Sequence, residues 1–319
     1  MMLHPAVPAL IVGSVAVCVV AGLAATAGMS VVVGWDPSDG SRRQLERERR
    51  SHLVAATLSL ALGFQLLSLF LFVAAAAHLH ALVTGAMCAV GTRNASRFGW
   101  PALAAKVTAF VLCGVWLVVH RATAGASAPA AVRFKFMFLL PVAAVLVTDT
   151  VLQLRFFADL DPEIVTSCCA TVFSPEAGGV ASGLALLPAS GVVAAFAVGL
   201  AVAAAAGLRC LLLGASPTPY AVVTLPLGAV AMAAVISWFA PAMTQLPTHH
   251  CPFCLLSPDH GYVGYPLYGL LSVAVVAGGG SGLVRRLRAL DGGDAIGPAG
   301  ERRLCAASLA GFALFALFG

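Results

Sequence analysis

The segment LVAATLSLALGFQLLSLFLFVAAAAHLHALV, residues 53–83, contains no Asp, Glu, Lys or Arg and is rich in Leu, Ala, Val and Phe. A helix of about 20 apolar residues is long enough to cross a hydrocarbon core of roughly 30 Å. This run is longer than one straight span needs, so we expect its helix to tilt or to continue into the membrane interface. The segment therefore indicates a membrane-spanning helix.

Similar apolar runs recur along the whole chain. Of its 319 residues, 60% are hydrophobic and 10% are charged, whereas roughly 25% of residues are charged in an ordinary soluble domain. Because no long polar block interrupts the runs, we expect residues 1–319 to form a single integral membrane domain. The predicted fold is an all-α bundle of about eight spans, at residues 6–34, 53–83, 101–120, 136–156, 179–207, 219–241, 262–284 and 303–318.

The distribution of basic residues predicts how this bundle is oriented. Most arginines lie in two loops that we assign to the cytoplasm, 35–52 and 285–302. Three loops on the other side hold two arginines and no lysine: 84–100, 157–178 and 242–261. Since Lys and Arg mark the cytoplasmic side, we expect both termini to be external. We expect the protein to lie in the lipid bilayer of a bacterial inner membrane. The formal charge of +5 does not indicate a nucleic-acid partner, because the basic residues cluster in a few loops.

Labelling tests this orientation. A cysteine introduced by Ser41→Cys should stay unlabelled by a membrane-impermeant maleimide in intact cells, because residue 41 lies in a predicted cytoplasmic loop. A cysteine introduced by Asp259→Cys, in a predicted external loop, should be labelled under the same conditions. Mass spectrometry of the labelled peptides separates these sites from the native cysteines. Labelling at position 41 in intact cells would reverse the predicted orientation.

Five of the nine cysteines fall in the predicted external loops, namely Cys88, Cys168, Cys169, Cys251 and Cys254. The last two belong to THHCPFC, residues 248–254, whose Cys-x-x-Cys spacing brings two sulfurs within disulfide reach. Such a pair can be redox-active, can form a structural disulfide in an oxidising compartment, or can bind a metal ion. We assign no role to the other four, Cys18, Cys113, Cys210 and Cys305, because buried apolar cysteines are usually inert.

Two histidines, His249 and His250, directly precede this cysteine pair. Imidazole beside thiolate suits zinc or copper, and a protonated imidazole also favours a neighbouring thiolate. A soft-metal site for copper, zinc or mercury, with Cys251, Cys254, His249 and His250 as ligands, is therefore an alternative to thiol chemistry. A polar loop that leads into a helix is the simplest interpretation of the histidines.

The adjacent cysteines Cys168 and Cys169 form a second pair. They can bridge each other only with strain, so each is better suited to exchange with another loop or to metal binding. A loop pair together with a Cys-x-x-Cys resembles the vitamin K epoxide reductase family and the quinone-linked disulfide-generating membrane proteins. The resemblance covers Cys168, Cys169, Cys251 and Cys254 alone. It implies a quinone as cofactor and a soluble thioredoxin-like or secreted thiol protein as partner, and it leaves the electron acceptor open.

A few ionisable side chains lie within the predicted spans or at their ends. His78, Lys106, Asp149 and Arg155 all fall toward the predicted external ends of their helices. Ionisable residues are rare in lipid and mark functional sites by default, so these four are candidates for binding a quinone or relaying protons. Purely structural pairing is the alternative. We expect Asp149 to face the bundle interior, with Lys106 or Arg155 as its partner.

These patterns favour a membrane thiol–disulfide redox protein with its chemistry on the outer face. In this interpretation Cys251 attacks and Cys254 resolves, while Cys168 and Cys169 shuttle the disulfide to or from a soluble partner. The first alternative is a membrane protein that binds or transports a soft metal ion through the same Cys and His residues. The second alternative is a transporter or scaffold with structural disulfides. The sequence contains no GxxxxGK[ST] motif, so it does not predict an ATP-driven pump.

Overall fold

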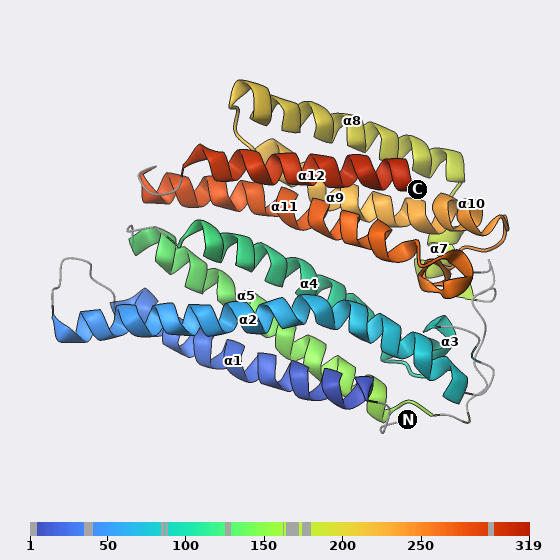
Figure 1. Ribbon diagram of the computed structural model, residues 1–319, viewed down its shortest axis with the longest axis horizontal. Coiled ribbons are helices and arrows are strands. Elements are labelled where there is room, and N and C mark those ends of the chain that lie inside the picture. The colour runs from blue at the N-terminus through green and yellow to red at the C-terminus, as the bar shows by residue number, and fades with distance from the viewer. Residues whose placement is uncertain are drawn as a thin grey trace. The chain divides into compact units, whose positions relative to one another are not determined.

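A computed structural model of the chain describes residues 5–34, 41–83, 86, 89–124, 129–161, 163, 172–173, 180–292 and 297–319. Within these residues the regular secondary structure consists of helices alone, which confirms the predicted all-α class (Figure 1). The long helices are α1 (Ala6–Gly34), α2 (Arg42–Leu79), α4 (Gly99–Ala122), α5 (Pro129–Ala158), α8 (Ala189–Leu213), α9 (Thr218–Ala234), α11 (Gly264–Asp291) and α12 (Pro298–Phe318). The short ones are η1 (His80–Leu82), α3 (Ala89–Asn94), α7 (Val180–Ala185), the π-helix η3 (Val235–Phe239), α10 (Ala240–Thr244), η4 (Cys254–Leu256) and η5 (Pro258–His260).

Seven helical segments of the described chain are long and apolar enough to cross a membrane. They correspond to α1, α2 with η1, α4, α5, α8, the continuous run Thr218–Thr244, and α11. The predicted eighth span is the 21-residue helix α12. Glu301, Arg302 and Arg303 lie in its first turns, which leaves a shorter apolar segment than a span requires.

Two helix boundaries differ from the predicted ones for identifiable reasons. The arginine-rich segment before residue 53, expected to be a loop, is already helical from Arg42, because Arg, Glu and Gln are good helix formers and hydropathy does not register them. The predicted helix 179–207 is interrupted at Pro188, which lies directly before α8 and adopts an extended conformation. Proline has no N–H to donate within a helix, so it marks the start of α8.

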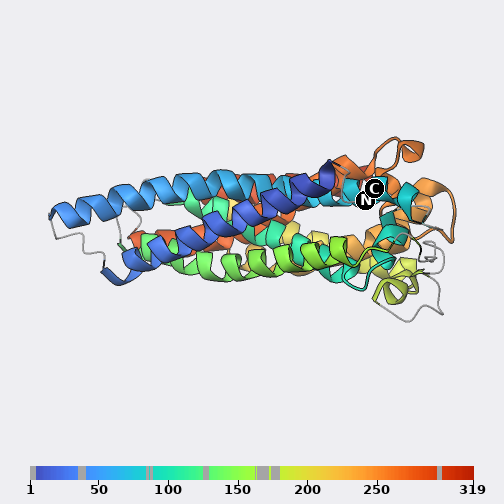
Figure 2. The same cartoon turned by 90° about the horizontal axis from the view of Figure 1, so that it is seen from below.

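The described helices form two compact units, each with its own apolar core. Unit 1 comprises Met1–Ala75, Arg97–Asp159 and Leu283–Glu301. Here α5 packs against both α1 and α4, and Figures 1 and 2 show these helices lying lengthwise beside one another. Trp116 and Phe136 are fully or almost fully buried in the apolar core of this unit.

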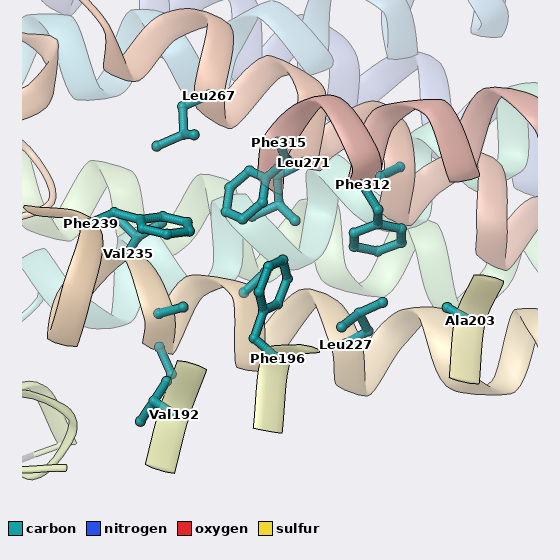
Figure 3. Close-up of a cluster of buried hydrophobic side chains, with 14 of the residues drawn as sticks. Val192, Phe196, Ala203, Leu227, Val235, Phe239, Leu267, Leu271, Phe312 and Phe315 are labelled. Carbon is teal, nitrogen blue, oxygen red and sulfur yellow. The ribbon is translucent and has the colours of Figure 1, made fainter. Parts of the chain in front are cut away.

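Unit 2 comprises Ala76–Ser96, Leu160–Gly282 and Arg302–Gly319. Its apolar core contains an aromatic cluster that we define as Phe196, Phe239, Phe312 and Phe315 (Figure 3). The ring of Phe315 lies 5.7 Å from that of Phe196 and 5.5 Å from that of Phe239, between ring centroids. These three rings come from α8, η3 and α12, so the cluster ties together helices distant in sequence.

Small residues let the helices of unit 2 approach closely. A Cβ atom on Gly278 of α11 would lie 2.8 Å from Ser308 Oγ of α12. A Cβ atom on Gly282 would lie 2.6 Å from the Cβ of Ala221 in α9. Both separations are too short for a side chain, so Gly278 and Gly282 of GGGSG, residues 278–282, serve helix packing.

Candidate functional site

The THHCPFC loop begins just after a break in the regular hydrogen bonding of the preceding helix. The π-helix η3 makes the Ala240 N–H donate to the Val235 carbonyl oxygen. In that register the next donor would come from residue 241, which is proline and has no N–H. The Ile236 carbonyl oxygen instead meets Nδ1 of His250 at 3.0 Å. The π-helix and Pro241 together therefore create an anchor point for the loop.

Further contacts hold the same loop in place. The Tyr268 hydroxyl, from the second turn of α11, donates to the Pro252 carbonyl oxygen at 2.6 Å. The Ser257 hydroxyl donates to the Cys254 carbonyl oxygen at 2.8 Å. Leu255 is fully buried in the core of unit 2. The cysteine pair is thus carried by a well-anchored loop, which is what a preorganised site requires.

Three potential metal ligands converge in this loop. One ligand atom each from His249, Cys251 and Cys254 lies within 4.8 Å of the other two. In a tetrahedral zinc site the donor atoms lie about 3.3–3.8 Å apart, since Zn–S is about 2.3 Å and Zn–N about 2.0 Å. The three donors therefore need only small shifts to coordinate one ion. His250 lies beside them in sequence, but its Nδ1 is engaged with Ile236.

Burial distinguishes the two cysteines. Cys251 has 1% of its surface exposed, whereas Cys254 is only partly buried. An attacking thiolate must be accessible to its partner. In any exchange reaction Cys254 would be the accessible thiol and Cys251 the resolving one, the reverse of the order expected from the sequence.

A buried arginine lies against the centre of the motif. The Arg93 guanidinium carbon of α3 lies 3.9 Å from the ring centroid of Phe253, and the Arg93 side chain is fully buried. Such cation–π contacts are strongest when they are desolvated. The contact places a fixed positive charge against Phe253, inside the Cys-x-x-Cys motif. Sequence reasoning missed this contact, although an arginine within the small-residue segment GAMCAVGTRNAS was a usable signal.

The other predicted thiol residues, Cys168 and Cys169, lie outside the described residues, as does Cys88. The predicted exchange of Cys168 and Cys169 with another loop therefore stays a prediction. The described segment that follows Cys88 does reach the site, because α3 begins at Ala89 and carries Arg93.

The predicted intramembrane candidates separate into a buried pair and two exposed residues. Lys106 Nζ lies 3.0 Å from Asp149 Oδ2, and both side chains are fully buried inside unit 1. Gln65 of α2, which sequence reasoning missed, donates to the same oxygen at 2.7 Å. Asp149 thus faces the interior with Lys106 as its partner, as expected. Arg155 and His78 are exposed and do not belong to this buried pair.

A neighbouring set of polar contacts joins α1 to α5. Gln153 Nε2 donates to the Leu10 carbonyl oxygen at 3.1 Å, and Cys18 Sγ lies 3.3 Å from the Leu146 carbonyl oxygen. Residue numbers rise along α1 as they fall along α5, so the two helices are antiparallel. These contacts make the interior of unit 1 polar on one side of α5.

The fold and the site define a multi-span helical membrane protein with a compact His/Cys cluster. Comparisons with family models, with curated proteins and with solved structures give no significant match for this chain. The resemblance to the vitamin K epoxide reductase family therefore rests on the arrangement of the cysteines alone.

Proposed function

We propose that this membrane protein binds a soft or borderline d10 metal ion, Cu(I) or Zn(II), through His249, Cys251 and Cys254. The convergence of one imidazole and two sulfur donors within 4.8 Å carries the proposal. Thiolate and imidazole ligands suit these two ions. The burial of Cys251 favours coordination over exchange with a soluble protein, because a ligand needs no access for a protein partner.

The site would hold its ion with three protein donors. Structural zinc sites are usually closed by four protein ligands, whereas sites with three leave a position open for an exchangeable ligand. An open position suits a protein that takes up an ion and passes it on. On the predicted topology the loop is external, so the ion would be captured outside the cytoplasm.

Metal content tests the proposal. Purified wild-type protein should hold a tightly bound Cu(I) or Zn(II) ion in this cluster, and Cys251→Ser and Cys254→Ser should each lower the affinity of the cluster at least about 100-fold. That figure is the upper end of the loss produced by outer-shell substitutions, and a ligand contributes more. His249→Ala should also weaken binding. His260→Ala, in the same loop but outside the cluster, should leave metal binding unchanged.

Equal metal binding by wild type and the double Cys251→Ser/Cys254→Ser variant would overturn the metal site. It would leave thiol–disulfide exchange, which the partial exposure of Cys254 favours as the second candidate function. In that reaction the Cys254 thiolate attacks a partner disulfide and forms a mixed disulfide. The Cys251 thiolate then attacks Cys254, which releases the reduced partner and leaves a Cys251–Cys254 disulfide.

Trapping separates the two candidates. If exchange is the function, Cys251→Ala should accumulate a mixed disulfide through Cys254, because the resolving thiol has been removed. Metal coordination predicts no trapped species in this variant. Cys168 and Cys169 would pass the disulfide onward only under the exchange reaction.

A further inference from the structure

Unit 2 contains a second pair of sulfur atoms, far from THHCPFC in sequence. Sγ of Cys305 lies 3.3 Å from Sγ of Cys210, and the residues have 0% and 2% of their surfaces exposed. Cys210 lies in the last turn of α8 and Cys305 in the first half of α12. Two thiols from different helices in direct contact form a potential two-donor site, whereas the sequence predicted no role for either.

The surroundings of this pair favour a soft ligand. Both cysteines belong to the apolar core of unit 2, together with the fully buried Tyr220. The Tyr220 hydroxyl donates to Ser308 Oγ at 2.7 Å, and Ser308 Oγ donates to the Ala274 carbonyl oxygen at 2.6 Å. The two hydroxyl groups nearby thus already donate hydrogen bonds within the core. The two sulfur atoms are therefore the atoms best suited to bind a ligand here.

Two arginines lie at the same end of unit 2 as this pair. Arg209 directly precedes Cys210. Gly214 ends α8 in the left-handed conformation, and Arg302 Nη2 lies 3.1 Å from where a Cβ atom on that glycine would be. Two thiolates and one monovalent ion carry a net charge of −1, and a basic helix end is compatible with such a charge.

The two sulfur sites lie at opposite ends of unit 2. The stretch of α12 from Cys305 to its C-terminus spans roughly 20 Å at about 1.5 Å per residue. At that far end, a Cβ atom on Gly319 would lie 2.5 Å from the ring of Phe239, in the π-helix that also anchors His250. The aromatic cluster lies along this length of α12, so the two sites cannot share one ion (Figure 3).

We propose that Cys210 and Cys305 form a second site, selective for a monovalent d10 ion such as Cu(I) or Ag(I), so that unit 2 holds one soft ion near each end. Soft thiolate ligands select Cu(I), whereas Zn(II) requires about four donors and is a poor fit to two sulfurs. Binding replaces two S–H protons by one ion and releases both protons. The proposal goes beyond the proposed function, because it places a separate, sulfur-only site in the core of unit 2.

Titration of the full-length protein in detergent, under reducing conditions and against a colorimetric Cu(I) chelator, tests this inference. Cys210→Ser/Cys305→Ser should lose one Cu(I) equivalent relative to wild type and keep its Zn(II) binding unchanged. Cys251→Ser/Cys254→Ser should lose a different Cu(I) equivalent together with Zn(II). Cys113→Ser, a buried thiol of unit 1, is the matched control and should lose neither.

The outcomes separate the two proposals. Full Cu(I) binding by Cys210→Ser/Cys305→Ser, with one equivalent lost from Cys251→Ser/Cys254→Ser, would overturn the second site and leave the proposed function intact. The opposite pattern would overturn the proposed function and leave the second site standing. If the double Cys210/Cys305 variant does not fold, Cys210→Ser alone should weaken one Cu(I) site at least about 100-fold, and an unchanged affinity would reject the inference.

Discussion

Asp149→Leu is expected to lower the free energy of unfolding by about 3–5 kcal/mol, the usual cost of removing one partner from a buried ion pair. The cost arises because Lys106, which is 3.0 Å from Asp149 and fully buried, would be left as an uncompensated charge. Gln65 would also lose the acceptor to which it donates at 2.7 Å. Thermal or denaturant unfolding in detergent measures the effect.

Two controls make this test specific. The double variant Lys106→Met/Asp149→Leu should recover most of the lost stability, because apolar residues of similar volume often replace a buried ion pair without cost. Arg155→Leu on the same helix should change stability by less than about 0.5 kcal/mol, because Arg155 is exposed. A double variant as unstable as Asp149→Leu would contradict the view that the unpaired charge causes the loss.

Phe312→Ala should cost about 3–5 kcal/mol, the range for emptying a fully packed aromatic position. The side chain of Phe312 has 0% of its surface exposed and lies in the aromatic cluster of unit 2 (Figure 3). Truncation removes packing inside the apolar core of unit 2 and leaves a cavity that a helix bundle closes only partly. The same unfolding measurement applies.

Phe318→Ala provides a control of the same residue type on the same helix. Phe318 is 49% exposed, so its truncation should cost far less than that of Phe312. Equal losses from the two variants would mean that α12 does not pack into unit 2 by this face. The comparison therefore tests whether α12, although not a candidate span, is an integral part of the core.

The fold class was predictable from the sequence because it depends on local composition. Apolar runs such as residues 53–83 must form helices in lipid, since every backbone polar group needs an internal partner there. Helix ends were less predictable. Hydropathy reports apolar content and not helical propensity, so it stopped at residue 53 although the charged segment before it continues the same helix to Arg42.

The candidate site was only partly predictable. Asp149 could be recognised as needing a polar partner because it lies in an apolar helix, but two cations were possible partners and packing selected Lys106. The cysteines of THHCPFC could be recognised by their spacing. Their unequal burial, with Cys251 inside and Cys254 at the margin, depends on the anchors provided by Ile236 and Tyr268.

Composition and spacing alone therefore determined that this is a helical membrane protein with a cysteine pair beside two histidines. Only the tertiary structure decided that a ring nitrogen of His249 lies close to both sulfurs of the pair and that Arg93 lies against the ring of Phe253. It also decided that the sulfurs of Cys210 and Cys305 are in contact. The physical reason is that the free energy of transferring a helix into lipid is a sum over residues that are neighbours in sequence. The contacts named above join segments that are distant in sequence. Such contacts depend on how each helix is rotated and anchored, and hydropathy does not record that information.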